Sequence, residues 1–190
     1  MCAGPGMKTN LIAQKVNINT KILAIEFDKK RMKETSKILN DYCFKTIHLL
    51  NADSIDPPIN TKIRFDKIIL DPPCSGSGTF RANPELKWRE NYGFLNQNII
   101  LQEKLLNSAI KLLKPGGILV YSTCSLYAEE GELQILKFLD KLIPLKLPDL
   151  VGYSYNINNE LIPGTGRLYP ANHNTQGFFI AKFRKNEFGI

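Results

Sequence analysis

Apolar runs and amphipathic stretches alternate along this chain of 190 residues. Most of the runs are uniformly apolar, which is typical of strands buried on both faces of a parallel sheet. Strands are predicted over residues 21–27, 45–52, 65–71, 118–124 and 177–185. Helices are predicted over residues 29–42, 94–113 and 129–142. The order of these elements predicts an α/β, doubly wound fold in a single domain, residues 1–190, with a loop-rich segment at about 146–175.

The carboxyl ends of four predicted strands carry chemically active residues. In a doubly wound sheet, ligands bind beyond the carboxyl ends of the strands. The sequences "EFD", "NAD", "DPPC" and "STCS" each lie at such an end, so we expect Glu26, Asp53, Asp71, Cys74 and Cys124 to line one crevice. The glycine-rich turn "CAGPGMK" leads into another predicted helix without a preceding strand, and we expect the first strand of the sheet to be truncated.

Charge and composition narrow the class of protein. The net charge of +7 and the pI near 9.2 favour a polyanionic partner such as nucleic acid, although a merely basic surface explains them equally well. No signal peptide pattern and no apolar run of roughly 18 residues is seen, which predicts a cytoplasmic protein without a membrane partner. The four cysteines form no C-x-x-C pair, so neither a metal site nor a disulfide framework is expected.

The acids after the first two predicted strands suit an adenosyl ligand. Glu26 can accept hydrogen bonds from a ribose diol, and Asp53 can accept one from an adenine amino group. Gly4 and Gly6 allow close approach of the backbone to a ligand. Because no dinucleotide or phosphate fingerprint is present, these residues favour S-adenosylmethionine over NAD.

The two thiols predict covalent chemistry at one pocket. Cys74 and Cys124 follow two strands that the helix 94–113 connects, and Asp71 can hydrogen-bond the edge of an extruded base. Methylation at C5 of a pyrimidine requires a thiolate that adds to C6. Its pKa should be lowered by a positive charge, for which Lys8 is a candidate. The residues alone leave open which thiol attacks.

Taken together, the motifs resemble the Nop/Sun (Fmu) family of RNA cytosine-5 methyltransferases. The resemblance rests on the following segments: "CAGPGMKT", "AIEFDKKR", "NAD", "DPPCSGSGTFRANPELKW", "LLKPGGILVYSTCSLYAEEGE" and "RLYPANHNTQGFFIAKFRK". It implies a Rossmann-like class I fold with S-adenosylmethionine as cofactor and tRNA or rRNA as partner, and we expect a monomer. Two departures are a glutamate at position 26, where many members have aspartate, and the absence of the usual amino-terminal RNA-binding region.

The resemblance also assigns roles. Cys124 is implied to be the nucleophile, Cys74 to act in product release, and Asp71 to contact both base and cofactor. The implied cofactor contacts are Cys2, Ala3, Gly4, Pro5, Gly6, Met7, Lys8, Glu26, Asp53 and Asp71. A non-catalytic remnant that binds RNA or a partner protein is the alternative hypothesis.

Overall fold

The computed structural model describes residues 1–40, 46–88 and 92–187. The chain divides into two compact units, Met1–Asn60 and Thr61–Ile190, and each is described by itself. Within the described residues no helix is long and apolar enough to cross a membrane. Among the same residues, no group of three or more His, Cys, Asp and Glu side chains could hold a metal ion.

The first unit contains two parallel strands and two helices. Its elements are α1 (Met7–Lys15), β1 (Ile22–Glu26), α2 (Lys29–Asn40) and β2 (Ile47–Asn51). The strands pair from Ile22 opposite Ile47 to Glu26 opposite Asn51. Asp28 caps α2, because its Oδ1 accepts the N–H of Arg31 at 2.7 Å. The predicted helix 29–42 and strand 45–52 are confirmed where the structure describes them; residues 41–45, with Cys43, lie outside it.

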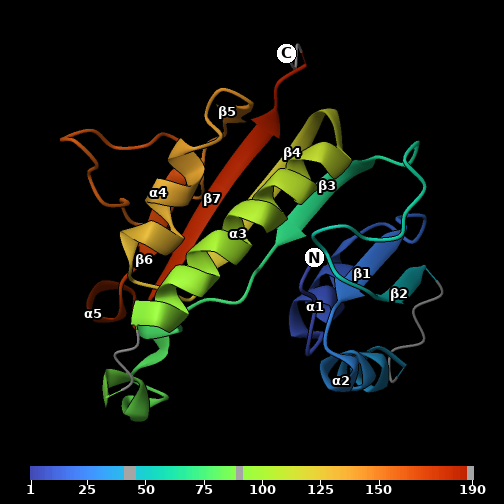
Figure 1. The fold of residues 1–190 in the computed structure, drawn as a ribbon, viewed down its shortest axis with the longest axis horizontal. Coiled ribbons are helices and arrows are strands. Elements are labelled where there is room, and N and C mark those ends of the chain that lie inside the picture. The colour runs from blue at the N-terminus through green and yellow to red at the C-terminus, as the bar shows by residue number, and fades with distance from the viewer. Residues whose placement is uncertain (41–45, 89–91, 188–190) are drawn as a thin grey trace. The chain divides into compact units, whose positions relative to one another are not determined.

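The second unit contains a five-stranded sheet (Figure 1). Its strands are β3 (Phe65–Leu70), β4 (Leu113–Thr123), β5 (Leu142–Pro144), β6 (Thr165–Leu168) and β7 (Phe178–Lys185). Its helices and 3₁₀ turns are η1 (Ser77–Thr79), η2 (Pro84–Trp88), α3 (Tyr92–Leu112), η3 (Ala128–Glu130), α4 (Glu132–Leu136) and α5 (Pro170–His173).

Four of these five strands run in the same direction. β3 pairs with β4 in parallel, whereas β7 is antiparallel to β4, β5 and β6. The strand order is β3-β4-β7-β5, with β6 paired to β7. The predicted α/β class with a mostly parallel sheet is therefore confirmed. The parallel pair matters for the site, because its two carboxyl ends lie at the same edge of the sheet.

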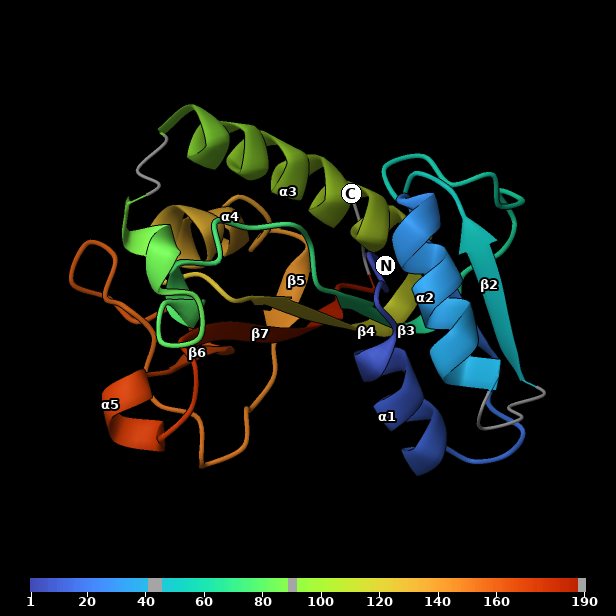
Figure 2. The ribbon, with the colours of Figure 1, turned by 90° about the horizontal axis from the view of Figure 1, so that it is seen from below.

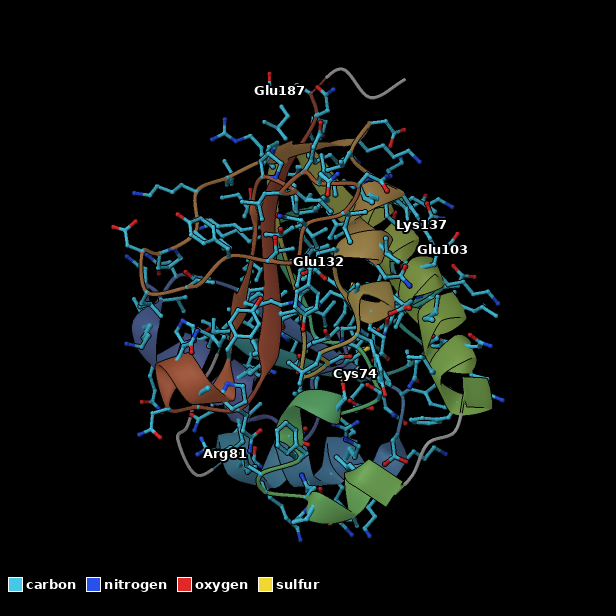
Figure 3. All side chains as sticks on the ribbon, turned by 90° about the vertical axis from the view of Figure 1, so that its left-hand side faces the viewer. Cys74, Arg81, Glu103, Glu132, Lys137 and Glu187 are labelled. Carbon is cyan, nitrogen blue, oxygen red and sulfur yellow. The ribbon has the colours of Figure 1, made fainter. Side chains whose placement is uncertain are left out.

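The core of this unit lies between the sheet and the helices α3 and α4, which cover the same face (Figure 2). Side chains from every layer are fully buried there: Leu70, Leu106, Leu113, Leu119, Tyr121, Ile135, Phe179, Ala181 and Phe183. On the outside, Glu103 of α3 and Lys137 just after α4 form an ion pair at 2.6 Å (Figure 3). Burial of apolar side chains at about 25 cal/mol per Å² is the main force that holds this unit together.

Three predicted elements differ in extent from the structure. The strand predicted over residues 118–124 is β4, which begins earlier, at Leu113. The predicted helix 129–142 ends at Leu136, because the chain then turns and Leu142–Pro144 pairs with the edge of β7. The backbone N–H and C=O groups of Leu142–Pro144 therefore bond to the sheet and do not continue the helix. The loop-rich segment 146–175 contains β6 and α5. β6 escaped prediction because its sequence, "TGRL", has no apolar pattern and its buried arginine depends on a distant partner.

Candidate active site

The thiols of Cys74 and Cys124 lie next to each other. Their Sγ atoms are 3.1 Å apart, and both side chains are half-buried. Cys74 follows β3 and Cys124 follows β4, and the parallel register of these strands places both loops at one edge of the sheet. The structure therefore brings these two cysteines together, and that they face one pocket stays a prediction.

The pKa of Cys74 is raised far above the usual value for a thiol. The hydrogen bond with Cys124 is the largest cause, burial is the next, and the negative charge of Glu130 adds to them. Cys74 therefore keeps its proton at neutral pH. The sequence led us to expect a positive charge that lowers a thiol pKa, but the charge that acts on Cys74 is a carboxylate. Lys8, the candidate cation, belongs to the first unit.

A buried carboxylate lies behind the Cys74 loop. Both oxygens of Glu130 accept the N–H of Ser75, at 2.9 and 3.1 Å. Gln102 of α3 donates from Nε2 to Glu130 at 3.0 Å and to the carbonyl of Pro73 at 2.9 Å. The hydroxyl of Tyr121 donates to the carbonyl of Glu130 at 2.9 Å. Glu130 thus links the Cys74 loop to α3 and β4.

Three hydroxyls join the two cysteine loops. The Oγ atom of Ser125 lies 3.1 Å from that of Ser75 and 3.3 Å from that of Ser77. Ser77 accepts the N–H of Leu126 at 2.9 Å, and the N–H of Gly78 donates to the carbonyl of Cys124 at 2.9 Å. The backbone that follows each cysteine is therefore fixed to the loop of the other.

A buried ion pair holds the loop after Cys124. Arg167 of β6 is fully buried and donates to both oxygens of Glu132, at 2.7 and 2.6 Å. Its Nη1 also donates to the carbonyl of Ser125 at 2.8 Å. The guanidinium lies 4.1 Å from the ring centre of Tyr155 and 5.2 Å from that of Phe179. The bidentate hydrogen bonds to the carboxylate and the contacts with the two rings leave the guanidinium little freedom to move.

Asp71 lies at the end of β3 and is half-buried. Its Oδ1 accepts a hydrogen bond from Ser122 of β4 at 3.2 Å. This bond ties the end of β3 to the neighbouring strand β4.

The candidate cofactor loop lies in the first unit, at the end of β1. The N–H of Ala3 donates to the carbonyl of Ile25 at 2.9 Å. Glu26 is buried, and its carboxylate accepts the N–H of Gly4 at 2.8 Å and that of Asp28 at 2.9 Å. A Cβ on Gly4 would lie 2.8 Å from Glu26 Oε2, so the close approach predicted from this glycine is present. Ala3 and Gly4 therefore lie directly against the end of β1 and Glu26.

Asp53 lies after β2 and is exposed. Its Oδ1 accepts the N–H of Ile55 at 2.8 Å, which fixes the turn that follows the strand. The predicted site residues thus fall into two groups: Cys2–Lys8, Glu26 and Asp53 in the first unit, and Asp71, Cys74 and Cys124 in the second.

Comparison with known proteins decides the family. The family model described as "16S rRNA methyltransferase RsmB/F" matches residues 1–184. The chain belongs to the RsmB/F methyltransferase family.

Several relatives of the chain are named as methyltransferases of ribosomal or transfer RNA. The chain is 35% identical over 188 residues to ribosomal RNA small subunit methyltransferase B of Shewanella oneidensis. The match covers 97% of this chain and 42% of that protein. It is 35% identical to the tRNA (cytosine(72)-C(5))-methyltransferase of Pyrococcus horikoshii, with 97% and 46% covered. The chain therefore spans less than half the length of these relatives.

Solved structures agree with the RsmB/F assignment. The structure of NSun6 from Pyrococcus horikoshii with SFG has a TM-score of 0.84 and 34% identity, and the match covers 97% of this chain and 46% of that one. The N-methyltransferase NodS of Bradyrhizobium japonicum, at 14% identity and a TM-score of 0.58 over 97% of this chain and 83% of that one, shows the fold alone. The predicted class I methyltransferase fold is confirmed, and the family indicates S-adenosylmethionine as its cofactor.

Four residues of this RsmB/F site were not predicted from the sequence: Gln102, Glu130, Glu132 and Arg167. The acids lie in "EEGE", which was interpreted as the start of the helix predicted over residues 129–142. Gly131 was the available signal, because a glycine between two acids weakens a helix and favours a turn.

Proposed function

We propose that this chain is the catalytic part of an S-adenosylmethionine-dependent RNA cytosine-5 methyltransferase, with Cys124 as the nucleophile. The observation that carries the proposal is the 3.1 Å separation of the Cys74 and Cys124 sulfurs at the ends of two neighbouring parallel strands. Two adjacent thiols in a family of RNA methyltransferases are explained by covalent chemistry on a pyrimidine.

The chemistry follows from the low nucleophilicity of C5 in cytosine. The thiolate of Cys124 adds to C6, and the displaced electron pair makes C5 able to form a bond to a methyl group. S-adenosylmethionine, when bound, supplies that methyl group. Removal of the C5 proton then returns an electron pair to the ring, the C6–S bond breaks, and Cys124 leaves as a thiolate. The ring recovers its original unsaturation with one methyl group in place of one hydrogen.

The two thiols differ in the role that each can take. The raised pKa of Cys74 keeps its proton in place, so this thiol can donate a hydrogen bond to the sulfur of Cys124. A donor next to Cys124 stabilises its thiolate, which supports Cys124 as the attacking group. The resemblance to Nop/Sun enzymes supports the same assignment and gives Cys74 its role in product release. Asp71, which follows the same strand as Cys74, is proposed to hydrogen-bond the base.

The first unit has the residues that an adenosyl cofactor requires. The Glu26 carboxylate already binds two N–H groups and has acceptor capacity left for the two hydroxyls of a ribose. The loop Cys2–Lys8 lies against this carboxylate, and Asp53 follows the neighbouring strand. We propose that these residues hold S-adenosylmethionine.

The proposed substrate is RNA of the transfer or ribosomal class. Relatives named for both classes match at about the same identity, so neither class is favoured over the other. The net charge of +7 supports a phosphate-rich partner.

The test uses RNA that contains 5-fluorocytidine. Fluorine at C5 cannot leave as a proton does, so the intermediate stays attached to the thiol after methyl transfer. With S-adenosylmethionine present, the chain should form a covalent adduct whose RNA is linked to Cys124. Cys124→Ala should form none, and Cys74→Ala should retain it. An adduct on Cys74 in the Cys124→Ala variant would overturn the assignment. RNA binding without any adduct in the unmodified chain would support the non-catalytic alternative instead.

A further inference from the structure

We propose that Glu130 is a positioning residue for Cys74: its carboxylate, together with Gln102, fixes both peptide planes next to that cysteine. The catalytic importance of this arrangement rests on the proposed function, in which Cys74 is one of the two acting thiols. The positioning of Cys74 by Glu130 does not depend on that function, and a thiol–disulfide equilibrium measures it directly.

The contacts fall on the two sides of Cys74. The N–H of Ser75 belongs to the peptide that follows Cys74, and it donates to both oxygens of Glu130. The carbonyl of Pro73 belongs to the peptide that precedes Cys74, and it accepts from Gln102 at 2.9 Å. Peptide groups are planar, so fixing one atom pair on each side leaves the backbone of Cys74 little rotation.

Glu130 and Gln102 act together because they are bonded to each other. The Nε2 atom of Gln102 donates to Glu130 Oε1 at 3.0 Å, and both side chains are fully buried. The hydroxyl of Tyr121, on β4, donates to the carbonyl of Glu130 at 2.9 Å and lies 3.3 Å from Oε1 of Gln102. The direction of the Cys74 side chain is therefore set by groups on η3 and α3, which Tyr121 ties to β4, the strand that Cys124 follows.

A carboxylate suits this place better than any neutral side chain. Both donors, Ser75 N–H and the Gln102 amide, point at it, and a carboxylate has acceptor sites on both oxygens. A glutamine at position 130 would turn one amide N–H₂ toward a donor and lose a bond. Burial of a charge is costly, so its presence here calls for a role that an apolar residue could not fill.

The second buried acid provides the contrast. Glu132 is two residues further on and contacts Arg167, which holds the carbonyl of Ser125, the residue after Cys124. Glu130 thus acts on the loop of Cys74, and Glu132 acts on the loop of Cys124. Substitution of each acid should affect a different thiol.

The experiment measures the effective concentration of one thiol toward the other. The whole chain is equilibrated under native conditions with reduced and oxidised glutathione, and the Cys74–Cys124 disulfide is quantified by peptide mapping. We expect Glu130→Gln to lower the effective concentration about tenfold or more, because small misplacements of reacting atoms have effects of this size. Glu103→Gln, which removes the same charge from an exposed ion pair on α3, should leave it unchanged.

A merely structural role would shift the unfolding midpoint of Glu130→Gln but leave the effective concentration in the folded chain unchanged, and that result would overturn the proposal. If Glu130→Gln does not fold, Gln102→Met carries the test: it keeps the volume of the side chain, removes the donor to Pro73, and should produce the same loss. An unchanged value in Gln102→Met would equally overturn the proposal.

The RNA adduct gives an independent readout. If Cys74 acts in release, Glu130→Gln should accumulate adduct with unmodified cytosine RNA, as Cys74→Ala does, whereas Glu132→Gln should form less adduct. Absence of any adduct in the unmodified chain and in Cys74→Ala would count against the proposed function. It would leave the glutathione result, and with it the positioning role of Glu130, unaffected.

Discussion

Gly78 and Gly177 are in direct backbone contact: the N–H of Gly177 donates to the carbonyl of Gly78 at 2.8 Å. A Cβ on Gly78 would lie 2.1 Å from the carbonyl oxygen of Gly177 and 3.0 Å from that of Cys124. The two glycines hold the beginning of β7 against the cysteine loops. No side chain larger than hydrogen fits at position 78 without displacing backbone.

Gly78→Ala is therefore expected to lower the free energy of unfolding by about 3 kcal/mol or more, since backbone cannot move aside as a side chain tip does. Gly76→Ala is the control. Gly76 has a φ of 72°, but its Cβ would meet nothing closer than 3.6 Å, so it should cost only about 1–2 kcal/mol for the left-handed conformation. Urea denaturation compares the two, and an equal loss in both would contradict the steric argument.

The pKa of Cys74 predicts a loss of stability in alkali. The thiol ionises near pH 9.0 in the unfolded chain and at higher pH in the folded chain. Above pH 9.0 the folded state therefore binds more protons, and stability falls as pH rises, by up to about 1.4 kcal/mol per pH unit. The free energy of unfolding, measured by urea denaturation between about pH 8 and pH 10, should fall less steeply with pH in Cys74→Ser than in the unmodified chain. Tyr121, whose pKa is raised above 10.0 by burial, contributes only above this window.

The buried pair of Arg167 and Glu132 should contribute far more to stability than an exposed pair. Arg167→Met leaves a carboxylate buried without its partner, and the free energy of unfolding should fall by about 3–5 kcal/mol. Lys137→Met breaks the exposed pair with Glu103, which should cost no more than about 1 kcal/mol. The double variant Arg167→Met, Glu132→Leu should be more stable than Arg167→Met alone. If it is less stable, the loss does not come from the unpaired carboxylate.

Oxidation should link the two site cysteines. Hydrogen peroxide removes two hydrogens from the two thiols, forms one S–S bond and is reduced to water. The Sγ atoms need to approach by only about 1 Å from their present 3.1 Å. Peptide mapping after mild oxidation should find a Cys74–Cys124 bridge, formed faster as pH rises because the thiolate is the attacking species. An equal rate of bridge formation in the urea-unfolded chain would show that proximity in the folded chain does not control the reaction.

Glu26 should control cofactor affinity. Glu26→Gln keeps the size of the side chain but replaces one acceptor oxygen with a donor. Hydrogen bonds to charged groups contribute about 1.5–3 kcal/mol, so the Kd for S-adenosylmethionine should rise about tenfold to a hundredfold. Titration calorimetry measures this, with Glu34→Gln on the exposed face of α2 as the matched control. An unchanged Kd in Glu26→Gln would remove Glu26 from the proposed cofactor site.

The sequence was sufficient to predict the strands that carry the thiols. Runs such as "IIL" and "ILV" indicate burial directly, since successive side chains are apolar whichever face they occupy. The parallel pairing of β3 with β4 follows from the helix that connects them, and the meeting of Cys74 and Cys124 follows from that pairing. The proximity of these thiols was thus accessible from local patterns.

The residues that hold the thiols in place were not accessible in this way. Glu130, Glu132 and Arg167 are charged, and charged residues are usually exposed unless a partner neutralises or bonds them. Their partners lie far away in the sequence: Arg167 is 35 positions from Glu132, and Glu130 is 55 positions from Ser75. A local pattern contains no information about such pairs. For the same reason β6, which carries Arg167, was interpreted as loop.

Arg167 contacts the loop after Cys124 through the carbonyls of Ser125 and Tyr127 rather than through side chains. Every amino acid has a carbonyl, so the path of this loop does not depend on which residue occupies position 127, whose side chain is 44% exposed. Substitutions at that position can therefore alter what the loop presents to a substrate while its backbone stays in place. Related enzymes could diverge in specificity here without rebuilding the surroundings of Cys124.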